Sequence, residues 1–152
     1  NPGGGYGGGL VWVQIGGEVT MNGTITANGG DGGQYYHAGG SGGGIFLASI
    51  GPFSGGTAAV LQATGGSGNT HSGGGGGGRI AVWYDVPDGS RQHMLTDPDN
   101  PLIVRGLSMS NSCDNYLGAF HVDGGPGWSN GWPGTIRFLN IIQDKGLVLT
   151  IW

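Results

Sequence analysis

The chain has 152 residues, of which 39 are glycine, and its five basic and nine acidic residues give a net charge of −4. So few cations exclude a nucleic-acid partner, because phosphate binding needs clustered Lys and Arg. No apolar run approaches the roughly 20 residues of a membrane-spanning helix. The glycines follow no Gly-X-Y period, which excludes collagen. Low charge with abundant Gly, Asn, Ser and Thr suits an extracellular or cell-surface location, which we therefore expect.

A Gly-rich phrase followed by an apolar run recurs along the chain. It first reads Gly-Gly-Leu-Val-Trp-Val and returns as Gly-Gly-Ile-Phe-Leu-Ala and Gly-Arg-Ile-Ala-Val-Trp, so that Leu10, Ile45 and Ile80 are spaced by 35 residues. A period in this range marks a repeat architecture. Repeat proteins of this kind present extended surfaces, which favours a structural or binding function.

Each phrase predicts one strand. These first strands are expected at 10–15, 45–50, 80–84 and 136–141. Side chains alternate between the two faces of a strand. One face is expected to carry Leu10 and Trp12 together with Ile45, Leu47, Ile80, Val82, Ile136 and Phe138. The opposite face is also largely apolar, so we expect both faces of these strands to be covered.

A short turn and a second strand are expected after each first strand. The second strands alternate cleanly: the residues expected to face a core are Ile25 and Ala27, Leu61 and Ala63, Phe120 and Val122, and each strand ends in Gly-Gly. Stacking equivalent strands gives a parallel ladder. The chain is therefore predicted to be all-β, a Gly-rich parallel β-solenoid (β-helix) of about three to four coils.

The Gly-rich segments 3–9, 29–44, 65–78 and 124–134 allow two interpretations. They are either flexible loops or ordered extended strands that bond to one another as polyglycine II. The entropy lost on ordering so much glycine favours loops. Repetition at equivalent places favours order, because neighbouring repeats supply hydrogen-bond partners, and we expect the ordered form.

We expect one domain, 1–152, with repeats at about 3–30, 31–66 and 67–125 and a partial repeat at 126–152. The third repeat is interrupted by an insertion at 85–118, which carries five of the nine acidic residues. Insertions in repeat proteins map to loops on one face, often the binding face.

The chain ends in an apolar run that predicts an uncovered edge strand. The residues expected to mediate assembly are Leu147, Val148, Leu149, Ile151 and Trp152. An exposed edge pairs readily with another chain, and head-to-tail contacts that do not close form filaments. Copies of the chain itself are thus the expected partners.

The run from Ser72 to Tyr84, Ser-Gly-Gly-Gly-Gly-Gly-Gly-Arg-Ile-Ala-Val-Trp-Tyr, and the earlier Thr24 to Gly30 carry a resemblance. They resemble Gly-rich repeats of large secreted and cell-surface proteins of bacteria, over roughly 3–84 and 118–140. That resemblance implies a parallel β-helix-like fold and no assigned activity. The Gly runs are also similar in composition to the polyglycine II tips of phage tail-fibre adhesins. Neither resemblance transfers a catalytic residue.

No cofactor is expected. The Gly-rich runs lack the Lys-Ser/Thr and the strand-turn-helix context of phosphate-binding loops. Asp97 and Asp99 could supply oxygen ligands to calcium, although a solvated loop explains them more simply. His37 and His71 lie at nearly equivalent places in successive Gly-rich segments and are weak candidates for zinc or copper. Two histidines alone do not make a metal site.

Exposed aromatic residues give the better binding signal. Tyr35, Tyr36, Trp128 and Trp132 are the expected contacts to a ligand or partner, because Tyr and Trp dominate interface hot spots. The alternative is that they cover the glycine layer of their own domain. The single cysteine, Cys113, is expected to be a small buried residue or a loop thiol.

We expect no enzyme. A carboxylate pair for polysaccharide cleavage would have to come from Asp85 with Asp88 or Asp123. The sequence best fits an extracellular structural protein that self-assembles, head to tail, into a filament or surface layer. The alternatives are an adhesin or carbohydrate-binding module that binds surface glycans, and a polysaccharide-degrading β-helix enzyme.

Overall fold

The computed structural model describes residues 3–34, 36–86, 107–110 and 112–141. Over these residues the protein is all-β, without a helix. The strands are β1 (Leu10–Ile15), β2 (Val19–Met21), β3 (Thr24–Thr26), β4 (Gly44–Ser49), β5 (Phe53–Gly55), β6 (Val60–Gln62), β7 (Arg79–Tyr84), β8 (Leu107–Ser110), β9 (Ala119–His121) and β10 (Thr135–Ile141).

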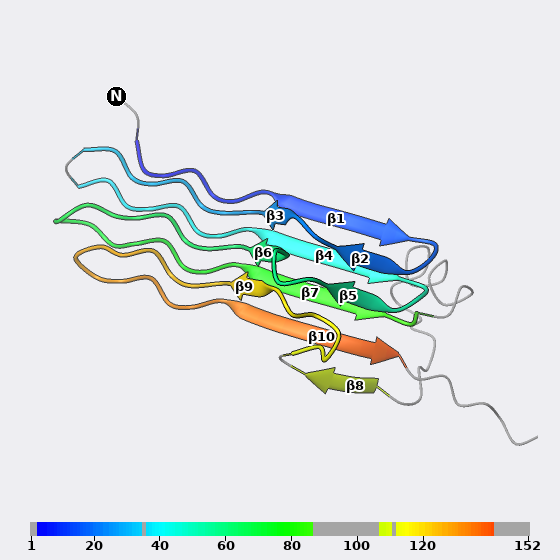
Figure 1. The fold of residues 1–152 in the computed structure, drawn as a ribbon. Helices are drawn as coiled ribbons and strands as arrows, with labels where there is room; N and C mark the ends of the chain where they lie inside the picture. Colours follow the sequence, from blue (N-terminus) through cyan, green and yellow to red (C-terminus); the bar gives the residue numbers. More distant parts are fainter. Residues whose placement is uncertain (1–2, 35, 87–106, 111, 142–152) are drawn as a thin grey trace, which may run out of the picture.

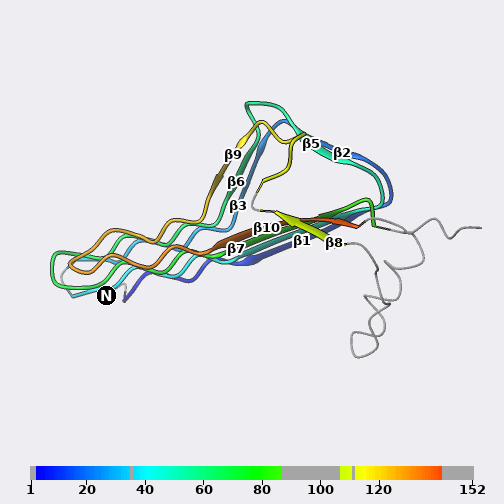
Figure 2. The ribbon, with the colours of Figure 1, turned by 90° about the horizontal axis from the view of Figure 1, so that it is seen from below.

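The strands form three sheets, which stack in a pattern consistent with a β-solenoid (Figure 1). The largest sheet has the order β1-β4-β7-β10-β8, a second pairs β2 with β5, and a third has the order β3-β6-β9. All pairs are parallel except β8 with β10. In Figure 2 the three sheets enclose a triangular space at one end, and the Gly-rich segments form two close layers at the other.

The register of the largest sheet corrects the expected alignment of the first repeat. Val11, not Leu10, pairs with Ile45, and Ile45 pairs with Ile80. The first interval is therefore one residue shorter than the second. Because side chains alternate, this slip exchanges the two faces of β1. Val11 and Val13 lie in the row of Ile45 and face the core, whereas Leu10 and Trp12 face outward.

The outer face of this sheet is exposed at β1, which contradicts the expectation that both faces are covered. Leu10 is 67% exposed and Trp12 55%. Trp12 contacts Phe46 with 4.7 Å between ring centroids, and Phe46 contacts Trp83 at 5.3 Å. Among the described residues, Trp12, Phe46 and Trp83 therefore form an aromatic row across three strands, packed on one another.

The expected short turn between first and second strands is a third strand. Val19–Met21 pairs with Phe53–Gly55 in parallel, and Tyr116 continues this row through a bridge to Gly55. Pairing between neighbouring coils supplies the hydrogen bonds that so short a strand cannot provide alone.

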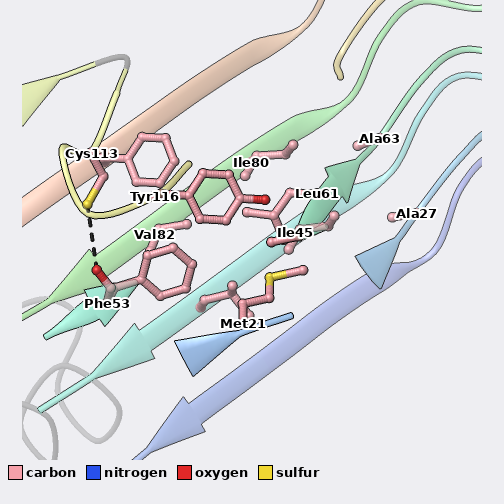
Figure 3. Packing of buried hydrophobic residues seen from close by; sticks show 13 residues of the cluster. Met21, Ala27, Ile45, Phe53, Leu61, Ala63, Ile80, Val82, Cys113 and Tyr116 are labelled. Carbon is pink, nitrogen blue, oxygen red and sulfur yellow. Dashed lines mark hydrogen bonds between the residues drawn. The ribbon is translucent and has the colours of Figure 1, made fainter. Parts of the chain in front are cut away.

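The core lies inside the triangle (Figure 3). Phe53, Tyr116 and Phe138 are buried there and their rings contact one another. The cluster also contains Met21, Ala27, Ile45, Leu47, Ala59, Leu61, Ala63, Ile80, Val82 and Cys113. Burying one such large apolar side chain stabilises the fold by about 1.5–3 kcal/mol.

The second strands lie as predicted. Ile25 pairs with Leu61, and Leu61 pairs with Phe120. Leu61 is fully buried and the side chains of Ile25 and Phe120 pack against the core cluster. Thr26, Gln62 and His121 form the neighbouring register position, and Thr26 and His121 are exposed.

Candidate functional site

The Gly-rich segments form two layers of extended chain joined by backbone hydrogen bonds, which we call the glycine lattice (3–9, 28–33, 38–43, 64–69, 73–78 and 123–134). Every third N–H donates to the next coil of the same layer. These bonds run from Gly5 to Ala38, Gly8 to Ser41, Gly29 to Thr64, Gly32 to Ser67, Gly39 to Gly73, Gly42 to Gly76, Gly65 to Asp123, Gly68 to Pro126, Gly74 to Ser129 and Gly77 to Trp132. The glycine segments are therefore ordered extended strands that bond to one another, as we expected, and not flexible loops.

A second row of bonds crosses between the two layers. In each of these bonds a backbone N–H donates to the carbonyl oxygen of a residue earlier in the chain, at 2.7–2.9 Å. The donors and acceptors are Gly131 to Gly125, Gly125 to Gly75, Gly75 to Gly66, Gly66 to Gly40, Gly40 to Gly30 and Gly30 to Tyr6. Each coil is thus bonded to the coil beside it and to the opposite layer. A buried backbone polar group without a partner is costly, and this pattern supplies those partners without any side chain.

The close approach of the layers explains why glycine is needed. A Cβ on Gly75 would overlap the carbonyl oxygen of Gly40 in the preceding coil, and one on Gly74 would overlap that of Gly125 in the other layer. The third residue of each turn points outward: a Cβ on Gly76 would lie 3.8 Å from the carbonyl oxygen of Trp132, its nearest neighbour. Side chains are therefore tolerated at one position in three.

The outward positions of one layer carry polar side chains that complete the hydrogen bonding. Asn28 Oδ1 accepts from the backbone N–H of Thr64 at 2.9 Å, and Asp31 Oδ1 accepts from that of Ser67 at 2.6 Å. The N–H of Ser67, and then its hydroxyl, hold the pKa of Asp31 below its usual value. Asp31 follows Gly29-Gly30, and its carboxylate oxygen is used as an acceptor within the lattice.

A shallow groove of about 320 Å³ runs along the junction of the lattice with the largest sheet. Its lining is mainly glycine backbone with Arg79 and Thr135. Every backbone N–H group of that lining donates to a backbone carbonyl oxygen. The donors belong to Gly42, Gly43, Gly77, Gly78, Arg79, Gly134 and Thr135. These donors are therefore already used and are not available to a phosphate group.

Four aromatic residues stand out from the lattice. Tyr6, Tyr36, Trp128 and Trp132 are each between 73% and 88% exposed, which agrees with the expected exposure of Tyr36, Trp128 and Trp132. Tyr36 and Trp128 belong to the turns at the narrow tip, and Trp132 lies on an outward row. Sequence reasoning missed Leu10 and Trp12 as exposed residues, because it expected both faces of the first strands to be covered.

At the tip Tyr36 adopts φ 60° and its ring contacts that of His71, with 5.2 Å between centroids. Left-handed backbone of this kind is uncommon outside glycine. His37 Nδ1 is a buried atom without a hydrogen-bond partner. Within the described residues no three His, Cys, Asp or Glu side chains gather in a metal-binding group, and His37 and His71 stay the weak metal candidates named from the sequence.

The acidic candidates do not converge among the described residues. Asp85 follows β7 with φ 57°, and Asp123 lies 3.9 Å from His121 Nδ1 in an exposed pair. Several expected site residues lie outside the described residues: Tyr35, Asp88, Asp97, Asp99, Leu147, Val148, Leu149, Ile151 and Trp152.

Cys113 is a buried thiol of the core, the first of its two expected roles. Its Sγ lies 3.7 Å from the carbonyl oxygen of Phe53 (Figure 3). Desolvation by burial, with the neighbouring Cys113, raises the pKa of Tyr84 to about 12. These groups sit inside the triangle of sheets, away from the glycine lattice.

Comparisons with protein-family models, curated proteins and solved structures give no match. The part of the chain that the structure describes contains no helix of the length and apolarity required to cross a bilayer.

Proposed function

We propose that this chain is an extracellular structural protein: a β-solenoid in which the Gly-rich segments form a polyglycine II slab. The observation that carries the proposal is the crossing row of bonds from Gly131 to Tyr6. It links both layers of every coil, so that no glycine segment can move without breaking bonds to its neighbours. A slab of this kind holds side chains at fixed spacing on its outer faces.

The low charge and the outward polar residues support an extracellular location. A role as a stiff spacer in a surface layer agrees with that location and with the hydrogen-bonded slab. The test is to image the native material. Immunogold labelling of the producing cells, with antibodies against the purified chain, should decorate extracellular structures, and negative staining of extracts should show slab-like particles. Labelling confined to the cytoplasm would overturn the proposal.

A second candidate function is adhesion to surface glycans. It is favoured by Tyr36, Trp128 and Trp132, which are exposed on the lattice or at its tip and separate from the core cluster. Aromatic faces suit stacking on sugar rings and packing on partner surfaces. On a glycan array, binding should be lost in Trp128→Ala and Trp132→Ala and kept in Trp12→Ala, whose ring belongs to the outer row of the largest sheet.

Self-association through 147–152 and polysaccharide cleavage stay predictions. Removing 146–152 should abolish any polymer while leaving the monomer folded, as measured by light scattering. Cleavage would require activity that disappears when acidic residues of the insertion are changed to their amides.

A further inference from the structure

The glycine lattice has two ends, and each carries side chains at positions that are glycine in the other coils. At the first coil the residue is Tyr6. At the last coil the residues are Asn130 and Pro133. The register of the largest sheet and the repeated hydrogen bonds define these equivalences.

Tyr6 is equivalent to Gly40, Gly75 and Gly131. A Cβ on any of those three glycines would overlap the backbone of the preceding coil: Gly40 against Tyr6, Gly75 against Gly40, and Gly131 against Gly75. Tyr6 is 88% exposed because its side chain points where a preceding coil would lie. A glycine strand added at this end would therefore meet the Tyr6 side chain at its backbone.

Pro133 is equivalent to Gly42 and Gly77, whose N–H groups donate to the next coil of the layer, at Gly76 and Trp132. Proline has no N–H, so the row of bonds stops at Pro133. Its ring also occupies the inward direction, in which a Cβ on Gly42 or Gly77 would overlap the opposite layer.

Asn130 satisfies a backbone donor at the edge of the second layer in the last coil. In the second layer, the N–H groups of Gly32 and Gly68 donate to backbone carbonyls of the next coil. The equivalent N–H of Gly127 donates instead to Asn130 Oδ1 at 3.2 Å. The side chain thus takes the place of the carbonyl that a further coil would supply.

The largest sheet is closed at the same end. β8 pairs with β10 in antiparallel fashion from Phe138 to Ile141, which occupies the edge that a further parallel strand would use. Covering an edge in this way is a common device against edge-to-edge association.

We propose that Tyr6, Asn130 and Pro133 terminate the glycine lattice at its two ends and so prevent a second copy of this chain from extending it. In a head-to-tail junction, Tyr6 of one copy would meet the backbone of Gly131 of the other, and Pro133 would offer no donor. Side-by-side contacts between copies are unaffected.

The decisive comparison uses two triple variants that differ by one methyl group. Tyr6→Gly/Asn130→Gly/Pro133→Gly removes all three side chains that terminate the lattice, whereas Tyr6→Ala/Asn130→Gly/Pro133→Gly keeps a Cβ at position 6. Sedimentation velocity over a range of concentrations should show that the glycine variant shifts to at least dimer mass. Wild type and the alanine variant should both sediment at the same, lower mass. A glycine variant that sediments like wild type, or an alanine variant that associates as strongly, would overturn the proposal.

A measurement on single variants covers the case in which the triple variants do not fold. Amide hydrogen exchange at Gly127 should be slow in wild type, at least about tenfold faster in Asn130→Ala, and again slow in Asn130→Asp, which retains an acceptor oxygen. Exchange that is equal in all three would show that Asn130 does not replace the missing carbonyl, and the terminator assignment would fail.

Discussion

The backbone N–H of Gly75 donates to the carbonyl oxygen of Gly66 at 2.9 Å, which joins the two layers of the glycine lattice. Gly75 also lies against the preceding coil, where an added Cβ would overlap the carbonyl oxygen of Gly40. One residue thus donates between layers and sets the spacing between coils.

Gly75→Ala should destabilise the protein by about 3 kcal/mol, because the added methyl group forces two closely packed backbones apart. The change in the free energy of unfolding is measured from urea denaturation, with the slope checked for two-state behaviour.

Gly76→Ala is the matched control, since it makes the same substitution one residue along. Its Cβ would lie 3.8 Å from the carbonyl oxygen of Trp132, in ordinary contact. We expect it to be between neutral and about 1 kcal/mol more stable, because alanine reduces the entropy of the unfolded chain. Equal destabilisation by both substitutions would contradict the proposed difference between the inward and outward directions of the lattice.

Much of the strand pattern could be predicted from the sequence because it rests on alternation over several residues. The alignment of Ile25 with Leu61 and Phe120 is an example. The register of β1 could not, because both Leu10 and Val11 are apolar and either fits beside Ile45. The slip is resolved by the lattice: bonds such as Gly5 to Ala38 fix the offset before the strand begins.

The lattice terminators were not predictable from composition. Tyr6 looks like one exposed aromatic residue among several until its equivalence to Gly40 is known, and that equivalence depends on the corrected register. Asn130 and Pro133 are common loop residues, and only the row of donors that stops at them gives them a role. The aromatic residues of the tip were found from sequence because glycine-rich surroundings leave them uncovered.

Phe138→Ala should lower the free energy of unfolding by about 3–5 kcal/mol, since Phe138 is fully buried and its ring contacts those of Phe53 and Tyr116. Phe46→Ala removes the same side chain from the outer row of the sheet, where it is only partly buried. It should cost less than half as much, and thermal unfolding of the two variants checks the order. A larger loss at Phe46 would show that the outer row, not the enclosed cluster, is the main core.

Cys113 should be unreactive toward a water-soluble thiol reagent in the folded protein. It is buried in the core cluster, and its Sγ lies 3.7 Å from the carbonyl oxygen of Phe53. Reactivity requires an accessible thiolate. Labelling, followed by absorbance, should therefore proceed only at the rate of unfolding and become fast in denaturant. Rapid labelling without denaturant would place Cys113 at the surface.

Tyr84 should make the protein less stable at alkaline pH. Desolvation by burial, reinforced by Cys113, raises its pKa from 10.0 to about 12, and burial also raises the pKa of Tyr116. Above pH 10.0 the unfolded chain releases phenolic protons that the folded protein retains, so the stabilisation present below pH 10.0 is lost as pH rises through about 12. Urea midpoints measured between these limits should fall with pH. The urea midpoint of Tyr84→Phe should fall less steeply with pH, with Tyr116 accounting for the remaining slope.

Ultraviolet absorbance of the phenolate gives the titration directly. An ordinary pKa near 10 for both residues would contradict the assignment, because partly buried phenols should ionise at higher pH than exposed ones.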